Sequence, residues 1–319
     1  MTALAVETAV GRPGIRTALD RGELLLHYQP IVDLRTRKPV AAEALLRWRR
    51  ADGLVAPGAF WHEADADCAV DIGRFVLDRA CAQVAGWRAA GLCAEVSVNT
   101  DPRELSASWV SSVYEALATH QLPSSALNVE LTETARVDPL TAADFTGALI
   151  RHGVGVSLDD AGTGFNALAT VSEMPLTELK IDRAFVSRLG NPRADALVRG
   201  LVAISAELGM RTVAEGVETE EQAQLLERYG VERAQGFLFS RPLPPDAFAD
   251  YWARACGPTV CAAKLIHELA ASGASAATIA AVLNRRGATG PNGRSWRAST
   301  VARALAGEIA TRPVARRPR

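Results

Sequence analysis

The stretch Val154-Gly155-Val156-Ser157-Leu158 runs directly into Asp159-Asp160. Its apolar and β-branched residues indicate a buried parallel strand, and such a strand is normally almost purely apolar. Two carboxylates at its end are therefore unusual. Four further apolar runs also end on a polar residue, and these residues are Asn99, Glu130, Asp182 and Glu215. Since the carboxyl ends of the strands in a (β/α)8 barrel meet at one face, we expect an active site at that face.

Candidate strands and helices alternate along most of the chain. Strands are expected near 95–99, 127–131, 154–158, 178–181, 211–214 and 232–234, and helices near 107–119, 139–151, 194–208 and 219–228. Residues 23–34 favour a strand, and residues 74–90 favour an amphipathic helix. Residues 40–46 look helical by composition, but their periodicity does not decide between a helix and a strand. The alternation predicts a parallel α/β fold, and its length suits a barrel.

Length and composition limit the class of protein. The 319 residues suffice for one large domain and a small one, and 48% hydrophobic with 22% charged residues is typical of a soluble globular protein. No apolar run reaches the roughly 18–20 residues that a membrane-spanning helix needs, and residues 1–20 lack a signal-peptide pattern. Five scattered cysteines without a CxxC pair favour free thiols, and hence a cytoplasmic location.

The charge is distributed unevenly between two parts of the chain. The net charge is −1, but residues 257–319 hold ten Lys or Arg and two acids, and their balance of +8 leaves −9 for residues 1–256. We therefore expect two modules, an acidic one that binds cations or a cation-bridged ligand and a basic one that binds a polyanion. Composition also changes at Gly257-Pro258, where we place the boundary.

The polar residues at the predicted strand ends are hard oxygen donors, the kind that bind Mg²⁺ or Mn²⁺. The set is Glu43, Asn99, Glu130, Asp159, Asp160 and Glu215. Two carboxylates ~4 Å apart repel by roughly 4 kcal/mol at an effective dielectric of about 20, so a converging set must hold protons or metal. Two ions in such a site can activate a water for in-line phosphoryl displacement. Lys180 is costly to bury unless it faces carboxylates or phosphates.

Each of these residues taken singly has a plainer explanation. An isolated acid is more often a helix N-cap or a solvated loop residue, and Lys180 alone suits the surface of an edge strand. Glu43 is the weakest member, given its helix-like surroundings. The prediction of a metal site therefore rests on the joint occurrence of the set.

Eight short motifs also occur in a fixed order. They are Tyr28-Gln29-Pro30-Ile31, Glu43-Ala44-Leu45-Leu46-Arg47-Trp48, Ser97-Val98-Asn99, Glu130-Leu131-Thr132-Glu133, Asp159-Asp160-Ala161-Gly162-Thr163-Gly164, Lys180-Ile181-Asp182, Ala214-Glu215-Gly216-Val217-Glu218 and Gln235-Gly236-Phe237. With these motifs, residues 18–256 resemble an EAL domain, the family of cyclic di-GMP phosphodiesterases. The resemblance implies a modified TIM barrel, the EAL fold, that forms a homodimer and hydrolyses cyclic di-GMP to linear pGpG with two Mg²⁺ or Mn²⁺ ions.

The resemblance further implies roles for single residues. Glu43, Asn99, Glu130 and Asp159 would hold the first metal, and Asp159 and Asp160 the second, which Glu215 and Gln235 would contact directly or through water. Lys180 would orient the nucleophilic water, so Lys180, Glu215 and Asp160 are the predicted catalytic residues. Gln29, Leu45, Arg47 and Gln235 would contact substrate, with Arg47 at a phosphate. Glu133 would brace the loop after Asp160.

Two departures from the family pattern concern activity. Ala161 stands where the family usually has Phe after the paired aspartates, which puts the loop, the dimer coupling and the turnover rate in question. Trp61-His62-Glu63-Ala64-Asp65 replaces the family's usual Ile-Pro-Leu-Ala-Glu, and this change could alter substrate access.

The basic C-terminal part predicts three short helices, at residues 262–271, from Ser275 to Asn284, and from about Trp296 onward. It is similar to the helical DNA-binding domain of large serine recombinases, and a helix-turn-helix unit with exposed arginines suits duplex DNA. The candidate DNA contacts are Arg285, Arg286, Arg294, Arg297 and Arg303. A helical appendage with a solvated basic face, or a dimerisation element, is the plainer alternative.

The expected organisation is a leader (1–17), the barrel (18–256), a helical module (257–308) and a basic tail (309–319). The leading hypothesis is a cyclic di-GMP phosphodiesterase with a DNA-binding module in residues 257–319 and no membrane contact. A second is a cyclic di-GMP receptor with little turnover that regulates DNA binding in response to the nucleotide. A third is a transcription factor whose barrel is only a dimer scaffold.

Overall fold

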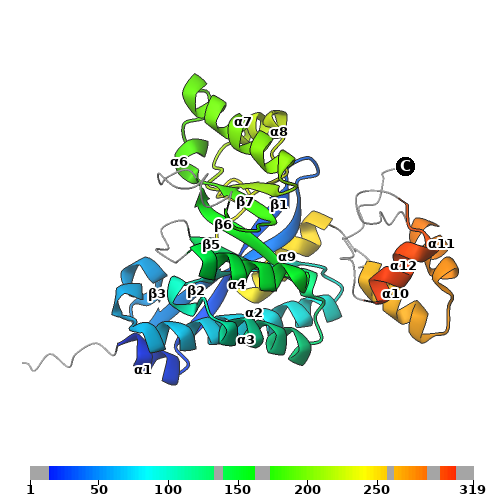
Figure 1. Ribbon diagram of the computed structural model, residues 1–319, viewed down its shortest axis with the longest axis horizontal. Helices are drawn as coiled ribbons and strands as arrows, with labels where there is room; N and C mark the ends of the chain where they lie inside the picture. The colour runs from blue at the N-terminus through cyan, green and yellow to red at the C-terminus, as the bar shows by residue number, and fades with distance from the viewer. Residues whose placement is uncertain (1–13, 133–138, 162–172, 257–261, 286–294, 307–319) are drawn as a thin grey trace, which may run out of the picture.

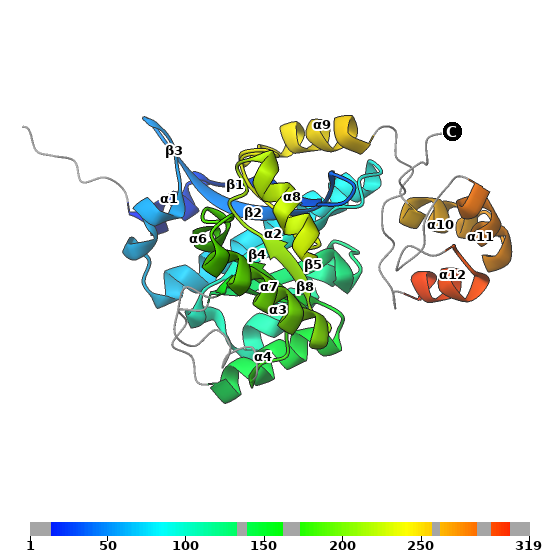
Figure 2. The same ribbon diagram turned by 90° about the horizontal axis from the view of Figure 1, so that it is seen from above.

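The computed structural model describes residues 14–132, 139–161, 173–256, 262–285 and 295–306. A closed barrel of strands surrounded by helices makes up most of this part of the chain, as Figures 1 and 2 show. Three further helices near the C-terminus have a hydrophobic core of their own.

Eight strands close the barrel, and a ninth extends it. The strands are β1 (Leu24–Asp33), β2 (Lys38–Arg50), β3 (Gly53–Val55), β4 (Glu95–Thr100), β5 (Leu127–Thr132), β6 (Gly155–Ala161), β7 (Glu178–Ile181), β8 (Arg211–Ala214) and β9 (Arg233–Ala234). The sheet has the order β1-β9-β8-β7-β6-β5-β4-β2-β3, and pairing between β1 and β2 closes it. β1 runs antiparallel to both its neighbours, whereas the other neighbours in the ring are parallel. The prediction of a modified (β/α)8 barrel is confirmed.

Helices cover the outside of the barrel. They are α1 (Ile15–Asp20), α2 (Ala66–Ala89), α3 (Ala107–Thr119), α4 (Pro139–Arg151), α6 (Arg183–Val186), α7 (Pro192–Glu207), α8 (Glu220–Tyr229) and α9 (Pro245–Cys256). Short 3₁₀ turns lie at Pro57–Ala59, Trp61–Glu63, Pro102–Glu104 and Ser124–Ala126. Helix α1 crosses the predicted leader boundary at residue 17, and its Ile15 and Ala18 lie in the main core of the barrel.

Two local features differ from a simple sequence interpretation. Residues 40–46, helical by composition, lie within β2, because pairing with β1 and β4 on its two edges outweighs the helix preference of the alanines. Helix α2 begins at Ala66, earlier than the predicted residue 74, because the Asp65 side chain caps it by accepting a hydrogen bond from the Cys68 N–H at 2.7 Å.

Four charged residues close the end of the barrel opposite the predicted site. They are the first residues of β4, β7, β8 and β9, namely Glu95, Glu178, Arg211 and Arg233. The Arg233 guanidinium lies 2.8 Å from Glu95 and 3.6 Å from Glu178, and Arg211 lies within 3.5 Å of both carboxylates. Glu178 and Arg233 are almost completely buried.

Replacing Arg233 by methionine is expected to lower the free energy of unfolding by about 3 kcal/mol, because it removes the closest cation of Glu95 and one of the two cations beside the buried Glu178. Urea denaturation measures this change, and Arg254→Met on the exposed side of α9 is the matched control. A loss below about 1 kcal/mol, the usual value of an exposed ion pair, would contradict the prediction.

The C-terminal segment forms three helices, α10 (Ala262–Ala271), α11 (Ala276–Arg285) and α12 (Ala298–Leu305). Their core includes Ile266, Ile279, Leu283, Trp296 and Val301. The Asn284 side chain accepts a hydrogen bond from the Trp296 N–H at 2.8 Å and donates one to the Trp296 carbonyl at 2.9 Å. These two bonds hold the chain that enters α12 against the end of α11. DNA binding by these helices stays a prediction.

Two other sequence expectations can be compared with the structure. Cys68 and Cys81 are buried free thiols, whereas Cys93 is disulfide-bonded, so the expectation of five free thiols is wrong. In the described ranges, the helices are all too short or too polar to cross a bilayer.

Candidate active site

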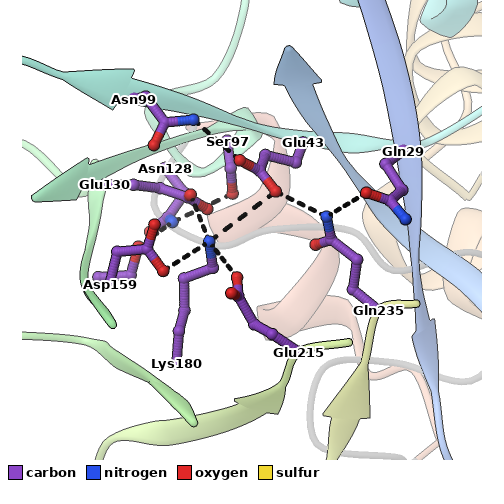
Figure 3. A network of polar contacts seen from close by, with 11 residues as sticks. Gln29, Glu43, Ser97, Asn99, Asn128, Glu130, Asp159, Lys180, Glu215 and Gln235 are labelled. Carbon is purple, nitrogen blue, oxygen red and sulfur yellow. Dashed lines mark hydrogen bonds and ion pairs between the residues drawn. The ribbon is translucent and has the colours of Figure 1, made fainter. Parts of the chain in front are cut away.

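Apart from Asp182, and from Asp160, whose side chain lies outside the described part of the chain, the predicted strand-end residues converge on the inside of the barrel at its C-terminal end (Figure 3). Each comes from a different strand or from the residue just after one. In order around the ring, the contributing residues are Gln29 (β1), Gln235 (after β9), Glu215 (after β8), Lys180 (β7), Asp159 (β6), Glu130 (β5), Asn99 (β4) and Glu43 (β2).

Strand periodicity arranges the inward-facing side chains of β4, β5 and β6 in two layers. Successive side chains of a strand point to opposite faces, so residues two apart share the interior. The upper layer holds Asn99, Glu130 and Asp159, and the lower layer holds Ser97, Asn128 and Ser157. In the lower layer, the Asn128 amide donates to the Ser97 and Ser157 hydroxyls at 3.2 and 2.9 Å. A polar floor thus supports the carboxylates from below.

Lys180 is the centre of the site. Its ammonium nitrogen lies 2.5 Å from Glu215, 2.6 Å from Glu130, 3.1 Å from Asp159 and 3.9 Å from Glu43. The side chain is 1% exposed. Burial opposes its charge, but attraction to Glu130 and Glu215 outweighs burial, and the pKa of Lys180 is raised well above its ordinary value. The lysine is therefore a fixed cation that offsets the repulsion among four carboxylates.

Two carboxylates around Lys180 hold protons more firmly than usual. Burial raises the pKa of Glu130 well above its ordinary value, and the neighbouring Lys180 charge only partly opposes this. Burial likewise raises the pKa of Glu215 to about 8, again against the attraction of Lys180. Titratable groups with such shifts inside a cleft are typical of catalytic sites.

A chain of amides orients Glu43 from its other side. The Gln235 amide donates to Glu43 at 2.6 Å and to Gln29 at 2.9 Å, and Asn99 donates to the second Glu43 oxygen at 2.8 Å. Gln29 in turn donates to the backbone carbonyl of Ser240 at 3.0 Å. These bonds leave the Glu43 carboxylate a single orientation, toward the interior of the barrel (Figure 3).

The paired aspartates lie where β6 becomes irregular. The register between β6 and β7 shifts between Leu158 and Ala161, which is a β-bulge or similar irregularity. Bulges are frequent next to active sites, where they re-aim a side chain. Asp159 points to Lys180, whereas the Asp160 side chain, Glu133 and the loop after Ala161 lie outside the described part of the chain.

Two cavities open beside the site and share Glu43 and Leu45. One of about 260 Å³ is lined by Gln29, Asp159, Glu215, Gln235 and also Arg183, Glu218 and Phe237. The other, of about 560 Å³, is more apolar and is lined by Trp61, Ile72, Val76, Asn99 and Glu104 among others. The side-by-side polar and apolar cavities offer room for a ligand with charged and aromatic parts.

The donor set fits a divalent cation in its chemistry. It consists of hard oxygen ligands, and the Glu130 Oε1 atom is buried without a hydrogen-bond partner. As the described side chains lie, the Lys180 ammonium takes the centre, and no group of three or more acidic, His or Cys side chains among them is spaced to hold an ion. Binding a metal therefore requires some carboxylates to turn from Lys180 toward the ion.

Some predicted residues lie apart from the Lys180 network. Arg47 is half-buried, its guanidinium donates to the Leu46 carbonyl at 2.7 Å, and burial lowers its pKa. Asp182 also follows a strand, but it serves as a helix N-cap. Its side chain accepts a hydrogen bond from the Ala184 N–H at 2.7 Å at the start of α6.

Sequence reasoning assigned no role to several side chains that line the two cavities. These are Glu104, Arg183, Glu218 and Phe237. Glu218 and Phe237 stood in quoted motifs, which was the available signal. Glu104 gave none, because its burial depends on the packing of the turn at Pro102–Glu104 against α2.

A closed barrel with a lysine-centred carboxylate cluster at its C-terminal strand ends defines a protein of the TIM-barrel class with an acidic site. The family of EAL domains matches residues 14–242, and the chain belongs to this family.

Similar proteins support this assignment. The bifunctional diguanylate cyclase/cyclic di-GMP phosphodiesterase MucR of Pseudomonas aeruginosa is 41% identical over 238 residues, which are 73% of this chain and 35% of MucR. The cyclic di-GMP phosphodiesterase PA2567 of the same organism is 31% identical over 234 residues, 72% of this chain and 40% of that protein. A structure of the MucR phosphodiesterase in complex with cyclic di-GMP has a TM-score of 0.69 at 40% identity, and the match covers 73% of this chain and 97% of that one. The chain spans about a third of the length of curated relatives such as MucR.

Proposed function

We propose that this protein hydrolyses cyclic di-GMP to linear pGpG. The observation that carries the proposal is the buried Lys180 ammonium held among Glu43, Glu130, Asp159 and Glu215 at the strand ends. MucR and PA2567 are named as cyclic di-GMP phosphodiesterases, and the solved MucR phosphodiesterase holds that nucleotide. The substrate is an anion, which suits an acidic site only if cations mediate the contact.

EAL phosphodiesterases generally depend on a divalent metal. In this chain, Glu43, Asn99, Glu130, Asp159, Asp160 and Glu215 would hold two Mg²⁺ or Mn²⁺ ions. When bound, the ions supply charge neutralisation at the phosphodiester and lower the pKa of a water.

Lys180 orients the attacking water and stabilises the charge that develops on the phosphoryl oxygens. Glu215, whose pKa burial raises to about 8, is in its ionised form a base strong enough to take the proton that the attacking water releases. Gln235 fixes the Glu43 carboxylate, Gln29 holds the Gln235 amide, and both amides and Leu45 face the nucleotide from the polar cavity. Arg47 meets a phosphate after its guanidinium leaves the Leu46 carbonyl.

The test compares pGpG release by the wild type and by Glu43→Ala, with Mg²⁺ and with Mn²⁺. We expect turnover by the wild type and a loss of at least about a hundredfold in the variant, since the substitution removes one carboxylate of the metal set and the acceptor of the Gln235 and Asn99 amides. Absence of turnover under both metals would contradict the enzyme proposal. Tight nucleotide binding without turnover would favour the receptor alternative, for which Ala161 is the relevant departure.

We propose DNA binding as a second activity, located in α10–α12. Arg285 and Arg297 are exposed, both flank the segment between α11 and α12, and α12 carries Arg303 on its outer side. The charge of residues 257–319 is +8, which suits a phosphate backbone. Arg286 and Arg294 lie outside the described residues. A homodimer through the barrel and a cytoplasmic location also stay proposals.

Duplex DNA affinity is expected to fall steeply with salt, because neutralised phosphates release counterions. Fluorescence anisotropy with the full chain and with a chain ending at residue 256 measures this, and the truncated chain should lose the salt-sensitive binding. Arg297→Glu is expected to weaken binding at every DNA sequence, with Arg193→Glu on α7 as the matched control. Equal affinity of the full and truncated chains would contradict DNA binding by this module.

A further inference from the structure

A groove separate from the Lys180 network follows one edge of β1. It has a volume of about 500 Å³, and residues 24–28 of β1 form one side of it. The other lining residues come from β2, β3, α2 and the start of α9, and include Arg49, Leu54, Phe75, Arg79, Gln83 and Pro244. The groove and the Lys180 network have no residue in common among the described residues.

Among the described residues, the edge of β1 that faces away from β2 is unpaired at Leu24 and Leu26, although both residues are largely buried. Pairing with β2 is regular from Leu24 to Ile31, whereas β9 pairs only with Val32 and Asp33 on the other edge. Tyr28 exchanges two backbone hydrogen bonds with Leu243 on that other edge, at 2.7 and 2.9 Å. Because alternate residues of a strand direct their backbone groups to the same edge, Leu24 and Leu26 also direct theirs away from β2.

These backbone groups have no partner within the described chain. In the described ranges, no strand, turn or side chain hydrogen-bonds the outward N–H and C=O groups of Leu24 and Leu26. An open edge of this kind is a template for an added strand from another chain. Residues 24–26 span about 7 Å at roughly 3.3 Å per residue, which is the length of three residues of an added strand.

The walls of the groove are apolar and basic. Leu54 is 49% exposed, and Phe75 is half-buried below the Arg79 guanidinium, which lies 5.7 Å from its ring centre. Arg49 and Arg79 are both exposed, and neither forms an ion pair within the part of the chain that the structure describes. Arg50 lies over the Trp48 ring at 3.8 Å and pairs with Glu63 at 3.7 Å. The groove therefore carries two uncompensated positive charges beside its open strand edge.

We infer that this groove binds an extended acidic peptide segment of a partner protein, which adds a strand to the edge of β1 at Leu24–Leu26. The peptide backbone pairs with the outward groups of Leu24 and Leu26. Its acidic side chains meet Arg49 and Arg79, and its apolar side chains lie against Phe75 and Leu54. The inference does not depend on the proposed hydrolysis.

The experiment measures binding of fluorescein-labelled acetyl-Asp-Val-Glu-Val-Asp-Val-amide to the full chain by fluorescence anisotropy. Arg49→Glu and Arg79→Glu are each expected to weaken binding by roughly tenfold or more, because an attractive charge becomes a repulsive one. Arg193→Glu on α7, an equal charge change far from the groove, should leave binding unchanged. All three are surface variants, and circular dichroism confirms that they are folded.

A second comparison separates strand addition from simple charge attraction. Two N-methylated versions of the peptide are compared. One carries methyl groups on the amides of residues 1, 3 and 5, and the other on the amides of residues 2, 4 and 6. Strand addition predicts that one version loses binding and the other keeps it, because only alternate amides face β1. Equal binding of both versions, or no binding of the unmodified peptide, would overturn the inference.

Discussion

Replacing Lys180 by methionine is expected to lower kcat for cyclic di-GMP hydrolysis by at least about a thousandfold, the scale of losing a preorganised charge at the reacting group. Methionine keeps the length and apolar stem of lysine but removes the ammonium that four carboxylates surround. The measurement is steady-state pGpG release at saturating nucleotide, with Mg²⁺ and with Mn²⁺. KM should change much less than kcat, because the lysine acts on the developing charge more than on the bound nucleotide.

Stability provides the control for this variant. Without the ammonium, the carboxylates repel one another, so Lys180→Met should unfold more readily than the wild type in metal-free buffer and recover with added Mg²⁺. Lys38→Met at the start of β2, at the opposite end of the barrel, should change neither property. A Lys180→Met variant within about tenfold of wild-type kcat would show that the lysine does not act in the reaction.

The positions of the site residues could be predicted from the sequence because strand ends and ligand chemistry are local properties. A run such as Val156-Ser157-Leu158 followed by Asp159 carries both the strand and its polar end in adjacent residues. The direction of β1 could not be inferred in this way. Its antiparallel pairing with β2 and β9 depends on contacts between distant parts of the chain.

The central position of Lys180 was also beyond sequence patterns alone. Its burial, its four carboxylate neighbours and its raised pKa depend on five different strands closing into a ring. For Glu43 the local sequence even favours the wrong secondary structure. It predicts a helix, whereas pairing with neighbouring strands places Glu43 in a strand. Patterns in the sequence thus identify the participants of the site, whereas the closed barrel decides which of them meet.

Glu104 is expected to make the stability of the barrel depend on pH in an unusual direction. Its side chain is 2% exposed and lies against Gly73 of α2, where an added Cβ would be 1.9 Å from the carboxyl oxygen. Burial raises the pKa of Glu104 to about 8, despite a hydrogen bond that its Oε2 atom accepts from the Asp101 N–H at 3.1 Å. The folded protein therefore holds a proton there that the unfolded chain releases near pH 4.3.

The sign of the effect follows from this difference in bound protons. Between about pH 4.5 and 8 the native state binds one more proton than the unfolded state, so this residue's contribution to stability falls as pH rises, by up to ~1.4 kcal/mol per pH unit. It is fully present below the unfolded pKa and is lost once pH passes the folded pKa of about 8. Glu104→Gln keeps the shape and the acceptor oxygen but removes the titration.

Urea unfolding of the wild type and Glu104→Gln at several pH values measures the difference. The variant should match the wild type near pH 5 and exceed its free energy of unfolding by roughly 3 kcal/mol near pH 8. Glu207→Gln at the exposed end of α7 controls for general effects of removing a carboxylate. A difference between Glu104→Gln and wild type that stays constant across this range would mean that Glu104 is ionised in the folded protein. In that case a cation not among its described neighbours would have to accompany it, because a carboxylate this deeply buried does not stay charged alone.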